Sequence, residues 1–304
     1  MRCRFSWRVT LKFIGACVIL FIVYQALKYF IVATGLYRQL EPGAVKGYVY
    51  CDVQLSAFKN FSWRYPCDFT PRPNPNGPII VTFVNAAWLS LAQNWVCSAE
   101  KVGLANNIYL ISFERGVCAK FPDVKCYEHP HVTVKGTAFG KAGYRTLMME
   151  RTKVILRLLS CYQNVALVDA DISFMRNPLS YLESVMTNKD IVFQADSVGV
   201  GFVDAVLPFF FSYICGGFIF MKSNYATKRL WMSVLQYQQN FFWNDQAGLN
   251  VCIRHHGQSV SWETLDSKHF PNGRQFFFYE ESSMNEVMIV HANHQYKVWT
   301  STYE

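Results

Sequence analysis

Two aspartates one residue apart, Asp169 and Asp171, follow a short apolar run in the segment NVALVDADISFMRN. Residues i and i+2 of a strand project to the same side, so the two carboxylates can converge where the strand ends. Adjacent carboxylates repel each other, and a divalent cation relieves that repulsion. Proteins hold Mn²⁺ or Mg²⁺ with one or two carboxylates and the phosphates of a substrate, so the pair predicts a metal site for a phosphorylated ligand. The structural alternative is that one or both acids cap the following segment or lie solvated in a turn.

Two other segments contain groups that such a site needs. HANHQYKVW includes His291 as an imidazole ligand and, six residues later, Lys297 as a cation for phosphate. FWNDQAGLN places Asp245 and Gln246 just before a predicted helix. Each feature alone is ordinary, because His291 could be a core histidine and Lys297 a surface charge. Their combination favours a site for a metal and a diphosphate.

The elements that must position these residues begin at residue 79, where apolar runs alternate with helical stretches. We predict strands at residues 78–85, 106–113, 164–168, 190–196, 215–223 and 286–293, and helices at residues 88–103, 143–161 and 224–239. The first strand, helix and second strand predict a β-α-β unit and a parallel sheet. The fold class is therefore α/β, with functional sites at the carboxyl ends of the strands.

The helix predicted over residues 143–161 is amphipathic. One face carries apolar side chains and the basic residues lie elsewhere on the helix; the apolar set is Leu147, Met148, Ile155, Leu158 and Leu159, and the basic set is Arg151, Lys153 and Arg157.

The N-terminal region differs from this body. Residues 13–32 are apolar apart from Lys28, and 20 helical residues span about 30 Å, the thickness of the hydrocarbon core of a bilayer. Basic residues before this segment keep the N-terminus cytoplasmic, which predicts a type II membrane protein with its body in the lumen. We expect a cytoplasmic tail at residues 1–12, a signal anchor at 13–32, a proline-rich stem at 33–78 and a catalytic domain at 79–304. A cleaved signal peptide is the alternative reading.

Charge and cysteine content agree with a lumenal body. Six of the 29 basic residues lie in the first 40 positions, which leaves 23 basic residues against 21 acidic ones and argues against nucleic-acid binding. Eight cysteines follow the apolar segment, an even number that suits disulfides, and no CxxC pair supports a zinc site. Cys118 could pair with Cys126 and Cys51 with Cys67, although pairing cannot be read from sequence. Asn60 lies in an N-glycosylation acceptor sequence.

The motifs resemble those of the nucleotide-diphospho-sugar transferases, glycosyltransferase family 77. The resemblance rests on LVDADISFMRNPL, CGGFIFMKSN, NDQAGLN and HANHQYK in this order, with IIVTFVNAAWLSLAQNW similar to the family's first strand and helix. It spans about residues 79–298. It implies a single GT-A domain, a Rossmann-like α/β/α sandwich, in a Golgi membrane protein. Such a domain transfers a sugar from a nucleotide donor, often a UDP-sugar, to a glycan or glycoprotein with retention of anomeric configuration.

The resemblance also implies roles for matching residues around the diphosphate. Asp169 would face the ribose and the metal, and Asp171 would bind Mn²⁺ or Mg²⁺. His291 would be the metal ligand from the C-terminal segment, and Lys297 would hold the diphosphate.

Other roles implied by the resemblance concern the two ends of the donor. Thr82 and Asn85 would line the nucleoside pocket, and Lys153 would approach the nucleotide. Gly216 and Gly217 would let the backbone approach the donor sugar.

Three polar residues are placed by these readings near the reacting sugar. The resemblance puts Asp245 and Gln246 near the anomeric carbon. Asp196 ends a predicted strand on the side of the site, which is compatible with a contact to acceptor or donor sugar and equally with a structural role.

The chain departs from the family pattern at two positions. His294 stands where an H-x-x-G-x-x-K pattern has glycine, and Cys215 stands where an asparagine is more usual. These changes bear on the choice of donor, and galactose, xylose and arabinose donors all occur in the resembling family. They also keep open a non-catalytic lumenal protein with the same fold. A haloacid-dehalogenase-type phosphohydrolase is the other alternative, although its DxD motif normally opens the domain, whereas DADIS lies in mid-chain.

Overall fold

Seven strands form the central sheet in the order β3-β2-β1-β4-β7-β6-β8. The computed structural model describes residues 77–129, 142–196, 214–241, 244–256, 259–277 and 283–293. Within these ranges the sheet strands are β1 (Ile79–Val84), β2 (Ile108–Ser112), β3 (Cys126–Glu128), β4 (Asn164–Val168), β6 (Ile191–Ala195), β7 (Ile214–Lys222) and β8 (Trp262–Thr264). A separate two-stranded sheet pairs β5 (Ile172–Phe174) with β9 (Ile289–His291).

The sheet is mixed, which corrects the prediction of a purely parallel one. β3, β2, β1 and β4 run parallel, and β6 and β8 are parallel to each other. β7 is antiparallel to both of its neighbours, β4 and β6. Apolar pattern identifies a buried strand but not its direction, because direction depends on how distant segments pair. The predicted α/β class is confirmed, and the central sheet is mostly parallel.

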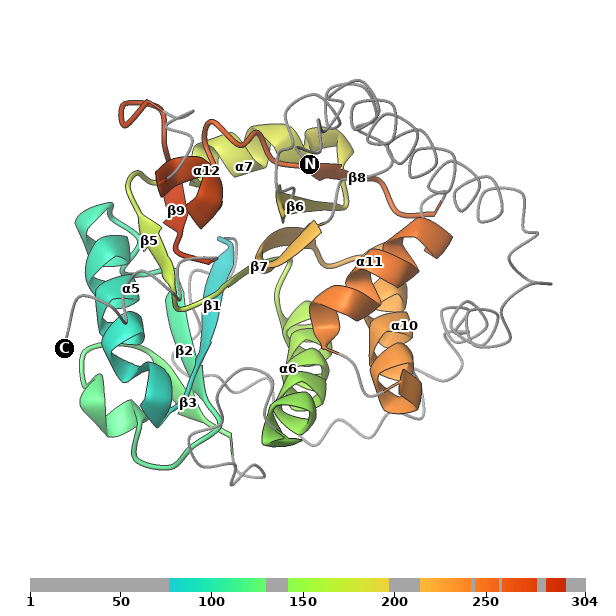
Figure 1. Cartoon of the computed structure of the whole chain (residues 1–304), viewed down its shortest axis with the longest axis horizontal. Helices are drawn as coiled ribbons and strands as arrows, with labels where there is room; N and C mark the ends of the chain where they lie inside the picture. Colours follow the sequence, from blue (N-terminus) through green and yellow to red (C-terminus); the bar gives the residue numbers. More distant parts are fainter. Residues whose placement is uncertain are drawn as a thin grey trace, which may run out of the picture. The chain divides into compact units, whose positions relative to one another are not determined.

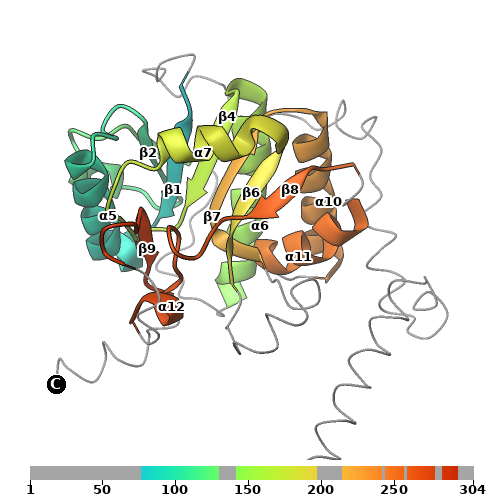
Figure 2. The same cartoon turned by 90° about the horizontal axis from the view of Figure 1, so that it is seen from above.

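Helices cover both faces of the sheet, as the two views show (Figures 1 and 2). The longer helices are α5 (Leu89–Lys101), α6 (Ala142–Cys161), α7 (Leu179–Val185), α10 (Tyr225–Phe241) and α11 (Asp245–His256), with a short α12 (Gly273–Phe277) and the 3-10 helices η1 (Ala86–Trp88), η2 (Cys118–Lys120) and η3 (Met186–Asn188). One hydrophobic core joins the sheet to α6, α10 and α11, and a second joins it to α5 and α7.

The two cores follow from the period of two in the strands. In β1, Ile79 and Val81 belong to the core beneath α6, whereas Ile80 and Val84 belong to the core beneath α5. Successive side chains of a strand point to opposite faces, so a strand buried on both faces reads as a continuous apolar run. The described residues lie within one unit, residues 50–304.

Helix boundaries agree with the local sequence. α5 ends one residue before Val102, and Gly103 follows at φ +82°, a left-handed conformation that glycine adopts without steric cost. The five apolar residues expected on one face of the 143–161 helix are all buried. Arg151, which we placed away from that face, is buried with them at 6% exposure.

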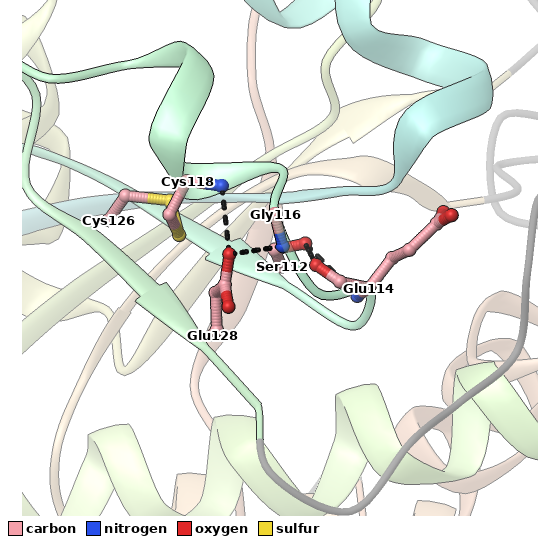
Figure 3. Close-up of a disulfide and its surroundings, with 6 residues drawn as sticks. All are labelled: Ser112, Glu114, Gly116, Cys118, Cys126 and Glu128. Atoms are coloured by element: carbon pink, nitrogen blue, oxygen red, sulfur yellow. Dashed lines mark hydrogen bonds between the residues drawn. A yellow bond between two sulfur atoms is a disulfide. The ribbon is translucent and has the colours of Figure 1, made fainter.

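A disulfide joins Cys118 to Cys126, as one of the predicted pairings required (Figure 3). Beside it, Glu128 Oε1 accepts hydrogen bonds from the backbone N–H groups of Gly116 and Cys118, at 2.7 and 3.2 Å. These contacts hold the loop that follows β2. Glu114 in this loop accepts a hydrogen bond from the backbone N–H of Ala86, which ties the loop to η1.

The other described cysteines are of two kinds. Cys161 and Cys252 are disulfide-bonded, whereas Cys97 and Cys215 are free thiols. Cys51 and Cys67 lie outside the described residues, as do Asn60 and the expected membrane segment. In the part of the chain that the structure describes, no helix combines the length and the hydropathy needed to cross a membrane.

Candidate active site

A cavity of about 410 Å³ opens where β1, β2 and β4 end and β7 begins. α6 and α11 contribute side chains from one side, and β9 and the residues after it from the other; the lining is Phe83, Val84, Asn85, Trp88, Phe113, Tyr144, Leu147, Met148, Arg151, Asp169, Ala170, Asp171, Asp196, Cys215, Gly216, Asn244, Asp245, Gln246, His291 and Asn293. The cavity therefore lies at the carboxyl ends of parallel strands, as α/β folds predict.

Three potential metal ligands meet at one side of this cavity. Asp169, Asp171 and His291 each offer one ligand atom, and these atoms lie within 4.8 Å of one another. The structure thus brings together two acids and a histidine that are more than 100 residues apart in sequence. An imidazole and two carboxylates are ligands that Mn²⁺ and related divalent ions accept. The donor set and its spacing fit a divalent cation.

Backbone pairing accounts for this convergence. Asp169 N donates to Gly217 O at 2.7 Å, which continues the β4–β7 ladder up to the first aspartate. Ile172 N then donates to Asp169 O at 3.1 Å, so the chain turns between the two acids and enters β5. β5 pairs with β9 so that Ile172 lies opposite His291. Figure 1 shows these two short strands side by side.

His291 and Asp171 form an ion pair. His291 Nε2 lies 3.2 Å from Asp171 Oδ1, and the histidine is only 3% exposed. Burial lowers the pKa of His291, but the charge of Asp171 and the neighbouring Cys215 outweigh burial and leave that pKa well above its ordinary value. Burial raises the pKa of Asp171, but His291 opposes it more strongly, so the pKa of Asp171 is lowered overall.

Arg151 is a site residue that sequence reasoning missed. Its guanidinium lies 3.0 Å from Asp169 Oδ1 and 3.4 Å from Asp245 Oδ2, and donates to Gly216 O at 3.2 Å. It also lies over the ring of Phe83, 5.3 Å from the centroid. Burial lowers the pKa of Arg151, but the charges of Asp245 and Asp169 raise it overall, so the side chain stays cationic.

A sequence signal for Arg151 existed in the helix period. Arg151 follows Met148 by three residues and precedes Ile155 by four, and residues three and four apart share a helix face. Lys153, which we expected near the nucleotide, lies off the cavity lining and pairs with Glu150 instead. The physical reason is helix rotation: two residues after Arg151, the side chain points about 200° away around the axis.

The site carries more negative than positive charge. Three carboxylates, Asp169, Asp171 and Asp245, face two basic groups, Arg151 and His291. Burial raises the pKa of Asp169, and Asp171 and Asp245 add to this effect, so the pKa stays raised despite the opposing charge of Arg151. The Asp169 side chain keeps 37% exposure to the cavity, so a cation there can reach it.

The missing side chain of Gly217 makes room for the proposed metal ligands His291 and Asp169. A Cβ at this position would lie 2.3 Å from His291 Cε1 and 2.9 Å from Asp169 Oδ2. No side chain fits between these groups, because carbon contacts normally measure about 3.5–4.0 Å. Gly216, in contrast, lines the cavity itself, and its N–H donates to Gln246 Oε1 at 2.9 Å. We expected both glycines to face the donor sugar; the structure places Gly217 against the metal ligands.

The residues expected near the anomeric carbon form a connected group. Gln246 Nε2 donates to Asp196 Oδ2 at 2.9 Å while its Oε1 accepts from Gly216, so both ends of the amide are engaged. Asp245 is 4% exposed at the start of α11 and faces Arg151. All three polar residues, Asp196, Asp245 and Gln246, line the cavity.

Aromatic side chains also line the cavity. Phe83 and Phe113 stack with ring centroids 5.5 Å apart and an interplanar angle of 7°, and Trp88 lies in the same lining. Asn85 is 3% exposed, lines the cavity and has a buried Oδ1 without a hydrogen-bond partner. Thr82, which we also expected to line a nucleoside pocket, is fully buried and lies off the lining.

Cys215 lies within the site rather than in a disulfide. The thiol is buried and its Sγ lies 3.7 Å from His291 Nδ1. It thus borders the histidine as well as the cavity. Lys297 and His294, the remaining residues that the sequence singled out, lie outside the described residues.

The sequence profile of the nucleotide-diphospho-sugar transferase family matches residues 116–300. The chain belongs to this family. The assignment confirms the predicted family and the glycosyltransferase class, and it leaves the phosphohydrolase alternative without support. Among curated proteins, the chain is 24% identical over 269 residues to the UDP-D-xylose:L-fucose alpha-1,3-D-xylosyltransferase of Arabidopsis thaliana, covering 79% of this chain and 70% of that protein.

Two further similarities come from other organisms. The UDP-galactose:fucoside alpha-3-galactosyltransferase of Dictyostelium discoideum is 22% identical over 176 residues, which cover 51% of this chain and 26% of that protein. Among solved structures, the glycosyltransferase GlyE of Streptococcus pneumoniae aligns with a TM-score of 0.51 at 12% identity, covering 74% of this chain and 56% of that one. This structural likeness concerns the fold. The chain spans just over half the length of the solved relative.

Proposed function

We propose that the chain is a metal-dependent, retaining glycosyltransferase that moves a sugar from a UDP donor to a glycan or glycoprotein. The observation that carries the proposal is the meeting of Asp169, Asp171 and His291 at a 410 Å³ cavity that aromatic side chains also line. Acidic and imidazole ligands beside a nucleotide-sized cavity suit a metal–diphosphate, and the family assignment supplies the class of reaction.

Binding would begin with the nucleoside. The base would stack at the aromatic wall formed by Phe83 and Phe113, and an N–H of the base would satisfy the orphaned Oδ1 of Asn85. The diphosphate would then lie beside Asp169 and Asp171. We retain Lys297 as the proposed cation for the diphosphate, on the strength of its position six residues after His291.

Mn²⁺ or Mg²⁺ held by Asp169, Asp171 and His291 would act as a Lewis acid on the departing diphosphate. The residues of the chain would do the rest. Arg151 would hold Asp169 and Asp245 in place and keep positive charge beside the leaving group. Asp245 and Asp196 would lie nearest the reacting sugar, with Gln246 linking Asp196 to the backbone of Gly216.

We further propose a fucosyl group as the acceptor. The names of the Arabidopsis and Dictyostelium relatives combine different donors, xylose and galactose, with the same acceptor sugar, fucose. Relatives that use different donors with the same acceptor sugar differ in their contacts to the donor sugar and share their contacts to the acceptor. UDP-xylose and UDP-galactose are therefore the first donors to test, with a simple α-L-fucoside as acceptor.

The decisive experiment is an assay of the full-length chain with each UDP-sugar, with Mn²⁺, with Mg²⁺ and with a chelator. We expect transfer or slow donor hydrolysis only with metal, and loss of at least 10²-fold in Asp171→Asn. Asp123→Asn is the matched control, because Asp123 is an exposed acid outside the cavity lining. Unchanged turnover in Asp171→Asn would refute the metal site. UDP binding without any turnover would instead support the non-catalytic alternative.

The N-terminal sequence supports a proposal about location. A 20-residue apolar segment after basic residues, together with an acceptor sequence at Asn60, is typical of a type II membrane protein, and the resemblance to family 77 implies the Golgi. In that location Asn60 is glycosylated and the body resists added protease until the membrane is permeabilised. An unglycosylated Asn60 with a protease-sensitive body would contradict it.

A further inference from the structure

A buried amide, Gln194, contacts the proposed metal-binding histidine, His291, at the ring nitrogen that does not face Asp171. Gln194 lies on β6 and is fully buried. Its Oε1 lies 2.7 Å from His291 Nδ1. Its amide nitrogen donates to the backbone carbonyls of Phe270 at 3.1 Å and Pro271 at 2.9 Å. Gln194 does not line the cavity, so any effect on the site must pass through His291.

The two carbonyl partners determine which way this amide points. If the amide were flipped, its oxygen would face two carbonyl oxygens, and the NH₂ group would face His291. A buried arrangement of three acceptors without a donor costs the desolvation of each unmet group, about 1–3 kcal/mol apiece. The amide oxygen therefore faces His291, and Nδ1 must carry a hydrogen to donate to it.

The consequence for His291 is that its two nitrogens are distinguished. Nδ1 donates to Gln194, whereas Nε2 faces Asp171 Oδ1 at 3.2 Å and the metal cluster. A proton on Nδ1 leaves Nε2 as the nitrogen whose lone pair can bind a cation. The same hydrogen bond prevents the ring from rotating.

An irregularity of the sheet lets Gln194 reach this position. The β6–β7 pairing shifts between Phe193, opposite Ile219, and Ala195, opposite Ile214, so β7 has four intervening residues where β6 has only Gln194. Such bulges bend a strand and redirect its side chains, often next to active sites. Here the irregularity coincides with the segment that contains Cys215, Gly216 and Gly217.

We propose that Gln194 is a positioning residue that keeps a proton on Nδ1 of His291 and so makes Nε2 the metal-binding atom. The proposal rests on the metal site of the proposed function. Outer-shell partners of metal-binding histidines typically change metal affinity by about 10- to 100-fold when they are removed.

Two variants of the full-length chain separate positioning from packing. Gln194→Met removes the acceptor and both donors at similar volume. Gln194→Glu keeps an acceptor for Nδ1–H but removes the donors to the carbonyls of Phe270 and Pro271. We expect the Kd for Mn²⁺, measured by electron paramagnetic resonance without donor, to rise about 10- to 100-fold in Gln194→Met and to return toward the wild-type value in Gln194→Glu. Equal losses in both variants, or no loss in Gln194→Met, would overturn the proposal.

A second measurement does not depend on these variants folding. In the wild-type chain with ¹⁵N-labelled histidine and Mg²⁺ as a diamagnetic ion, nitrogen NMR should show Nδ1 of His291 protonated and Nε2 unprotonated. His291→Gln identifies the signal by its disappearance. A ring protonated on Nε2 in the presence of metal would overturn the proposal.

The same series distinguishes this inference from the proposed function. If His291→Gln binds Mn²⁺ as tightly as the wild type, the metal site itself fails. If His291→Gln loses Mn²⁺ while Gln194→Met keeps it, the metal site stands and the role of Gln194 is refuted.

Discussion

Replacement of Gly217 by alanine should weaken metal binding by Asp169, Asp171 and His291 without removing any ligand. The new Cβ would lie 2.3 Å from His291 Cε1, at least about 1 Å closer than a normal carbon contact. It would also lie 3.0 Å from His291 Nε2. His291 cannot withdraw easily, because it is 3% exposed and Gln194 holds its other nitrogen.

The magnitude follows from the cost of overpacking. An added methyl group in a tightly packed interior costs about 1–3 kcal/mol, and relief of that strain here requires a ligand to move. If this energy must be supplied when the metal binds, the Kd for Mn²⁺ rises about 5- to 150-fold. If it appears in the apo protein instead, the melting temperature falls and added Mn²⁺ restores less of it than in the wild type.

The assay is a Mn²⁺ titration followed by electron paramagnetic resonance, with melting curves in the presence and absence of Mn²⁺. Gly248→Ala is the matched control, because Gly248 lies in α11 and off the cavity lining. Its new Cβ would lie 3.1 Å from Val234 Cγ1. We expect this control to leave the Mn²⁺ affinity unchanged. A Gly217→Ala variant with wild-type Mn²⁺ affinity and melting temperature would refute the reasoning.

Three further predictions concern stability. Arg151→Met should lower the free energy of unfolding by about 3–5 kcal/mol in urea denaturation, because it leaves Asp245 buried without its partner. Lys153→Met on the same helix should cost at most about 1 kcal/mol, and similar losses in the two variants would contradict the assignment. With metal chelated, the raised pKa of His291 stabilises the fold fully below about pH 6.5, and this contribution is lost as pH rises through the raised pKa. The stability advantage of the wild type over His291→Gln should therefore shrink as pH rises, and an advantage that grows with pH would contradict the prediction. The double variant Cys118→Ser with Cys126→Ser should lose about 2.5 kcal/mol in free energy of unfolding, from loop-closure entropy over a separation of 8 residues. Cys97→Ser, at an exposed free thiol, should change that free energy by no more than about 0.5 kcal/mol. A double variant as stable as Cys97→Ser would show that the disulfide contributes little.

Local sequence predicted most elements of the domain, because helix and strand periods are properties of neighbouring residues. The apolar runs at 79–84, 108–112 and 164–168 are strands, and the amphipathic segment at 142–161 is a helix. The three-residue strands β3, β5 and β8 were not predicted, because three residues alone are too few to establish a period. β9 is as short, but it lies within the apolar run predicted over residues 286–293.

Residue chemistry predicted the members of the site better than their contacts. The types and spacing of Asp169 and Asp171 already predicted a metal site, because two converging carboxylates repel each other, and the structure brings His291 to them. The burial of Arg151 was missed because a charged residue in an amphipathic helix is ordinarily assigned to solvent. Only the facing carboxylates of Asp169 and Asp245 make burial of Arg151 favourable.

The sequence alone therefore determined the family, the class of fold and the candidate ligands, because these depend on short motifs and local periods. The tertiary structure decided the direction of β7, the pairing of β5 with β9 that brings His291 to Asp171, and the contact of Gln194 with the histidine. Each of these joins segments tens of residues apart or more, and pairing over such distances is set by how the whole sheet closes rather than by any local pattern.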